Sequence, residues 1–148
     1  MISFTSDSPA ATQAFAERIG KALRPNTCIA FFGGLGAGKT TFTHGLAKGM
    51  GLPDVVSSPT FALVNEYHGD RCTSLYHFDM YRVTSEDALE TTGFWDYPLE
   101  DSVFVIEWAE NIVDALPKQR IEIRIDGMGD APRTITVTGE ELLHDFVG

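Results

Sequence analysis

The segment from Gly33 to Thr40 constrains the fold of this chain more than any other, because it reads GGLGAGKT and matches the P-loop pattern G-x-x-x-x-G-K-[ST]. Its glycines let the backbone turn sharply and bring successive N–H groups within reach of phosphate oxygens. Lys39 can place its charge on the β- and γ-phosphates, and the hydroxyl of Thr40 can ligate Mg²⁺. The segment therefore predicts a nucleotide site that uses Mg²⁺.

The residues on either side of this loop supply the context that a P-loop needs. Residues 27–32 read TCIAFF, a short apolar run typical of a buried parallel strand. On the other side, Phe42, Leu46 and Met50 recur at four-residue spacing and would share one face of a helix. Strand, glycine loop and helix in this order favour a phosphate-binding loop over a chance glycine-rich turn.

Capping signals predict further helices. Ser8 is suited to cap a helix whose first residue is Pro9, and the apolar periodicity carries that helix to near Pro25. Ser85, followed by acidic residues, predicts a short capped helix. We also expect a short helix over residues 140–146 at the end of the sequence.

Apolar runs and turn residues predict the strands. Residues 61–67 and 73–78 should form one antiparallel hairpin, and residues 120–125 and 133–138 a second. Residues 103–106 read VFVI and predict a second central strand. Helix-flanked parallel strands with antiparallel additions predict an α/β fold: a three-layer P-loop NTPase-like domain with a mixed, mostly parallel central sheet and antiparallel hairpins.

Composition limits the classes of partner. The 148 residues suit one domain over residues 1–148, and 21 acidic against 11 basic residues give a net charge of −10. Because such a surface repels phosphate backbones, we do not expect tight binding of nucleic acid by the chain itself. Cys28 and Cys72 show no metal or disulfide pattern, and no long apolar run or secretory signal is evident, so we expect a cytoplasmic protein without membrane contact.

Two acidic residues follow apolar strands and are candidates for the chemistry. Glu107 ends the run at 103–106, where Mg²⁺–nucleotide enzymes place the acid on the metal side; the alternative is a solvated strand end. Asp79 follows the strand at 73–78 and could orient an attacking water or act as a base, or it could cap a turn. Because no guanine-reading N-K-x-D sequence occurs, ATP is favoured over GTP.

Four segments together go beyond a generic P-loop. They read GLGAGKTT at residues 34–41, SPTF at 58–61, YHFDMYR at 76–82 and IEW at 106–108. In this order and in so short a chain they resemble the TsaE family, small bacterial ATPases of tRNA threonylcarbamoyladenosine biosynthesis. The resemblance covers the chain from about Ser8 to Val137; many members carry Asp where this chain has Gly34, which should not impair phosphate contacts.

The resemblance implies an ATPase that binds the threonylcarbamoyl transferase complex and resets it between turnovers, reaching tRNA only through that complex. It implies ATP and ADP as ligands and Mg²⁺ as metal, held by Thr40 and Glu107, with Lys39, Asp79 and Glu107 as catalytic candidates. It further implies a phosphate-binding loop made of Leu35, Gly36, Ala37, Gly38, Lys39, Thr40 and Thr41. A switch loop near the γ-phosphate would consist of Ser58, Pro59 and Thr60. Two looser matches to positions near the nucleotide are Thr12 and Arg133.

Two other functions share the P-loop. A small-molecule kinase usually needs an arginine-bearing lid over the phosphates, whereas the seven arginines of this chain are scattered. A regulatory binding module would respond to the nucleotide with hydrolysis only incidental. Steady-state ATPase assays with and without candidate partners distinguish these alternatives.

Overall fold

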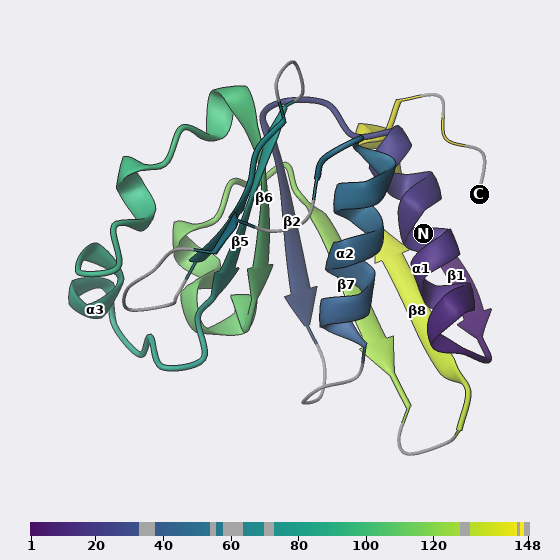
Figure 1. Cartoon of the computed structure of the whole chain (residues 1–148). Coiled ribbons are helices and arrows are strands. Elements are labelled where there is room, and N and C mark those ends of the chain that lie inside the picture. The colour runs from purple at the N-terminus through teal and green to yellow at the C-terminus, as the bar shows by residue number, and fades with distance from the viewer. Residues whose placement is uncertain are drawn as a thin grey trace.

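The computed structural model describes residues 1–32, 38–53, 56–57, 64–69, 73–127, 131–144 and 146. Within these residues eight strands form one mixed sheet in the order β1-β8-β7-β2-β6-β5-β4-β3 (Figure 1). Their bounds are β1 Ile2–Ser6, β2 Thr27–Phe32, β3 Val56–Ser57, β4 Val64–Tyr67, β5 Ser74–Asp79, β6 Ser102–Glu107, β7 Ile121–Asp126 and β8 Arg133–Thr138.

The four central strands of this sheet are parallel. β2 pairs with β6 on one side and β7 on the other, and β6 pairs with β5, all in parallel register. The outer strands are antiparallel: β4 pairs with β5 and β8 with β7, which confirms both predicted hairpins, although residues 61–63 lie outside the described part. The predicted α/β fold with a mixed sheet is confirmed. β1, which the sequence analysis did not predict, pairs antiparallel with β8.

Two helices cover one face of the sheet. α1 spans Pro9–Lys21, and the Ser8 hydroxyl accepts a hydrogen bond from the Ala11 N–H at 3.0 Å, as the capping signal predicts. α2 spans Lys39–Gly49 and lies beside α1 (Figure 1). Between these helices and the sheet lies an apolar core that includes Phe15, Phe31 and Phe42.

Glycines set the distance between α1 and α2. A Cβ atom on Gly45 would lie 2.6 Å from the Ala16 Cβ and 2.7 Å from the Gln13 carbonyl oxygen. On Gly20 and Gly49 it would collide with backbone carbonyls of the other helix. The helices therefore pack backbone to backbone, a contact that real Cβ atoms would prevent.

The opposite face is covered by shorter elements. These are α3 Glu86–Glu90 and the 3₁₀ turns η1 Phe94–Asp96, η2 Leu99–Asp101 and η3 Ala109–Ala115, which enclose a second core (Figure 1). Sheet and two coverings make the predicted three layers. Of the helices in the described part, none has the length and hydrophobicity that a membrane-spanning segment needs.

The predicted helix over residues 140–146 is wrong. The structure has only a 3₁₀ turn, η4 Glu140–Leu142, after which Leu143 is extended. The backbone N–H of His144 donates to the Ala22 carbonyl at 2.8 Å instead of continuing a helix, and the Phe146 ring packs 6.5 Å from that of Phe15. Docking against the end of α1 therefore outweighs the local helix preference.

The glycine contact gives a first prediction. Gly45→Ala should lower the free energy of unfolding by about 1–3 kcal/mol, because the added methyl overpacks the α1–α2 contact. Alanine is the better helix former, so helix propensity acting by itself would change stability in the opposite direction. His44→Ala, at an exposed position on the same helix, is the matched control and should stay within about 0.5 kcal/mol of the parent chain. Urea unfolding measures both, and a more stable Gly45→Ala would contradict the prediction.

Candidate functional site

The carboxyl ends of the parallel strands meet at one edge of the sheet, and α2 begins there (Figure 1). In open α/β sheets this edge is where ligands bind. Of the predicted site residues, Gly38, Lys39, Thr40, Thr41, Asp79 and Glu107 lie here. Leu35, Gly36 and Ala37 of the predicted loop, and Ser58, Pro59 and Thr60 of the predicted switch, lie outside the described residues.

Lys39 is the first residue of α2 and is buried, with 3% of its surface exposed. Gly38 precedes it with φ of +93°, a left-handed conformation that favours glycine and explains why the last glycine of the motif is needed. The Lys39 ammonium lies 5.5 Å from the centre of the Trp108 ring. Thr40 is exposed and Thr41 half-buried on the first turn of the same helix. A buried cation at the positive end of a helix favours an anionic ligand.

Glu107 ends β6, the strand beside the P-loop strand, as the sequence analysis predicts. Side chains alternate along a strand, and Val105 belongs to the core beneath α2, so Glu107 lies on the face that α2 covers. Its Oε2 lies 2.6 Å from Nε2 of His77, a buried histidine on β5. Burial disfavours the charged carboxylate, but the hydrogen bond from His77, together with the charges of His77 and Lys39, outweighs it and lowers the pKa of Glu107. Glu107 is therefore ionised at neutral pH.

Asp79 is opposite Glu107 in the parallel register of β5 and β6, on the same face of the sheet. It is exposed, and its Oδ1 accepts a hydrogen bond from the Tyr81 N–H at 3.1 Å. This hydrogen bond supports the turn-capping interpretation of Asp79, while its catalytic role stays a prediction. The Tyr81 ring in turn lies 5.1 Å from that of Trp108.

Thr12 and Arg133 lie at the same edge of the sheet but farther along it. Arg133 is paired with Ser6, whose hydroxyl lies 2.6 Å from that of Thr12. Arg133 also donates from Nη1 to the Ala131 carbonyl at 2.8 Å. Three strand spacings of about 4.8 Å separate β8 from β6. Ser6 therefore links Thr12 to the start of β8, and Arg133 lies about 14 Å along the edge of the sheet from Glu107.

The described oxygen donors fit Mg²⁺. A threonine hydroxyl and an ionised carboxylate are hard ligands of the kind that this ion prefers, and it usually keeps waters and phosphate oxygens as its other ligands. In the described part, no group of three or more His, Cys, Asp or Glu side chains could hold a metal by itself.

Sequence reasoning missed His77 as a site residue. The signal was present, because His77 precedes Asp79 by two positions and so shares its face of the strand.

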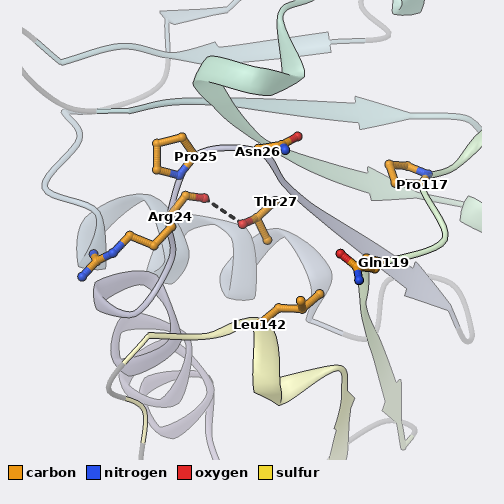
Figure 2. Close-up of a pocket in the computed structure, with 7 residues that line it drawn as sticks. All are labelled: Arg24, Pro25, Asn26, Thr27, Pro117, Gln119 and Leu142. Atoms are coloured by element: carbon orange, nitrogen blue, oxygen red, sulfur yellow. Dashed lines mark hydrogen bonds between the residues drawn. The ribbon is translucent and has the colours of Figure 1, made fainter.

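A pocket of about 320 Å³ lies away from this site, at the opposite end of β2, and includes Arg24, Asn26 and Thr27 (Figure 2). The length of the six-residue β2, about 17 Å, separates it from the site.

The comparisons with known proteins point in one direction. The family model described as "Threonylcarbamoyl adenosine biosynthesis protein TsaE" matches residues 6–135. A tRNA threonylcarbamoyladenosine biosynthesis protein TsaE from Bacillus subtilis is 41% identical over 131 residues, covering 88% of this chain and 81% of the relative. One from Rickettsia prowazekii is 33% identical and covers 97% of this chain and 99% of the relative.

Among solved structures, the crystal structure of Bacillus subtilis YdiB aligns with a TM-score of 0.70 at 32% identity. The alignment covers 92% of this chain and 83% of that one. The two proteins are therefore similar in sequence as well as in fold.

The pKa of Glu107 gives a second prediction. Because the pKa is lower in the folded chain than its ordinary value of 4.5, ionised Glu107 stabilises the fold above that pH. This stabilisation is lost as the pH falls through the folded-state pKa. In Glu107→Gln, which does not titrate, the free energy of unfolding should therefore fall less steeply below about pH 5 than in the parent chain.

Urea unfolding at a series of pH values measures this slope. Glu100→Gln, at an exposed position on η2, is the matched control and should keep the parent slope. Equal slopes for Glu107→Gln and the parent chain would contradict the prediction.

Proposed function

Because the chain belongs to the TsaE family of threonylcarbamoyl adenosine biosynthesis proteins, we propose that it is a Mg²⁺-dependent ATPase of the tRNA threonylcarbamoyladenosine system. In this role it binds the threonylcarbamoyl transferase complex and resets it between turnovers. The relatives named above are tRNA threonylcarbamoyladenosine biosynthesis proteins, which supports the assignment to this pathway.

The observation that carries the ATPase proposal is that Lys39 and Glu107 both lie at the carboxyl edge of the sheet, on the neighbouring elements α2 and β6. A buried ammonium at a helix start and an ionised carboxylate on the neighbouring strand are the two charges that phosphoryl-transfer sites of this kind require. Lys39 binds the β- and γ-phosphates and stabilises the negative charge that develops on them as the terminal bond breaks. The backbone of residues 35–41 holds the phosphates in place.

Thr40 and Glu107 are the residues that would hold Mg²⁺. When bound, the ion neutralises phosphate charge and orients the phosphate oxygens. Glu107 keeps its negative charge at neutral pH because of the contacts described above, and the exposed Thr40 hydroxyl lies on the first turn of α2. Asp79 orients the attacking water, with Ser58, Pro59 and Thr60 as the switch that responds to the γ-phosphate. Thr12 and Arg133 contact the end of the nucleotide away from the phosphates.

The charge distribution supports contact with tRNA through partners only. Residues 83–117 contain nine acidic and no basic residues. Seven of these acidic side chains are exposed on the layer that covers the face opposite α1 and α2, namely Asp87, Glu90, Asp96, Glu100, Asp101, Glu110 and Asp114. This layer repels an RNA backbone.

We further propose that the protein works in the cytoplasm. Cys28 is a free, buried thiol, and free cysteines are typical of proteins from a reducing compartment.

The site gives a third prediction. Lys39→Ala should reduce steady-state ATP turnover by about 100-fold or more, with and without the transferase-complex proteins. The reason is that it removes the positive charge that stabilises the phosphate group being transferred. Lys48→Ala, which removes an exposed lysine from the same helix, is the control and should keep the parent rate. Phosphate release measures turnover. Unchanged turnover in Lys39→Ala would contradict the site, and turnover absent from the parent chain under all conditions would favour the binding module.

The charge distribution gives a fourth prediction. The isolated protein should show no submicromolar binding to tRNA at about 0.15 M salt, because few phosphates could be neutralised by so acidic a surface. Fluorescence anisotropy of labelled tRNA measures this, with the same tRNA plus the transferase complex as the positive control. A tight complex with tRNA by itself that weakens as salt rises would overturn the indirect role.

A further inference from the structure

We propose that His77 is a positioning residue for Glu107: its ring holds one carboxylate oxygen so that the other is presented to Mg²⁺. The inference rests on the proposed function and adds to it a residue with no role among the groups assigned above. It is carried by the geometry of two neighbouring parallel strands.

The strand register brings the two side chains together. β5 and β6 pair His77 with Val105 and Asp79 with Glu107, so His77 and Glu107 are diagonal neighbours. Leu75 and Val105 belong to the core beneath α2, which places His77 and Glu107 on that face by alternation. The Nε2–Oε2 distance is 2.6 Å, and the side chains are 8% and 18% exposed. A short hydrogen bond with little access to water fixes the carboxylate in one orientation.

Lys39 explains why Glu107 needs to be held. Its positive charge lies at the start of α2, on the face of the sheet that Glu107 shares, so the ammonium and the carboxylate attract each other. A direct pair between them would withdraw the lysine from the phosphates and the carboxylate from the metal. His77 lies on β5, on the side of β6 away from the P-loop strand β2, so its contact with Oε2 opposes a direct pair with Lys39, and we assign Oε1 to the metal side.

A second histidine–glutamate pair shows what a purely surface contact looks like in this chain. His68 Nε2 lies 2.9 Å from Glu66 Oε1, with the side chains 44% and 30% exposed. His68 also contacts the Ser74 hydroxyl at the amino end of β5, at the opposite end of that strand from Asp79. This pair offers the matched control for His77.

The test compares two substitutions that each mimic half of the imidazole ring. His77→Gln places an amide nitrogen near the position of Nε2 and can still donate to Glu107. His77→Asn keeps a polar amide that is too short to reach Oε2. Calorimetry measures the affinity of each variant for ADP across a Mg²⁺ titration and in EDTA, so the result does not depend on turnover. Urea unfolding of each variant reports stability separately.

His77→Asn should raise the Mg²⁺ concentration for half-maximal tightening of ADP binding by about 10- to 100-fold, the usual effect of losing a partner that orients a metal ligand. Its ADP affinity in EDTA should stay within about 2-fold of the parent value, and His77→Gln should recover most of the Mg²⁺ effect. His68→Asn should leave the Mg²⁺ dependence unchanged.

Two results would overturn the inference. One is a His77→Asn protein that loses stability but keeps the parent Mg²⁺ dependence, which would make the contact purely structural. The other is an equal loss in His77→Asn and His77→Gln, which would exclude the hydrogen bond as the cause. If the parent chain binds ADP without any Mg²⁺ dependence, the proposed function itself fails, and this outcome is distinct from both.

Discussion

The charge of Lys39, buried at the start of α2, is the feature on which the rest of the site depends. Removing an ammonium from water is costly unless it is compensated, and the positive end of a helix dipole adds to the cost. The ionised Glu107 and the face of the Trp108 ring offset part of it. A cation buried at a helix start in this way favours an anionic ligand such as a phosphate.

The fold supplies the geometry that this charge requires. Parallel pairing of β2, β6 and β5 brings Glu107 and Asp79 to the edge where α2 begins, since parallel strands end on the same side of a sheet. Glycines at the α1–α2 contact let the two helices pack together over the sheet.

Much of this arrangement could be predicted from local sequence patterns. The P-loop strand has the predicted bounds, residues 27–32, and Glu107 ends the strand beside it. These features follow from patterns that extend over fewer than ten residues. β1 and the 140–146 segment were not predicted correctly because their structure is decided by contacts distant in the sequence, with β8 in one case and with the end of α1 in the other.

The sequence by itself determined which residue types are available at the ends of strands and at the start of α2, because glycine spacing, strand runs and capping residues act over short ranges. It also placed the chain among the TsaE proteins by resemblance, which the comparisons confirm. Only the tertiary structure decided that His77, rather than Lys39, holds the Glu107 carboxylate, and that Asp79 caps its own turn. The contact between His77 and Glu107 depends on the register of β5 against β6, a pairing between segments about 30 residues apart that no short stretch of sequence specifies. For Asp79 the sequence offered the turn-capping alternative, and the structure shows the hydrogen bond that it requires.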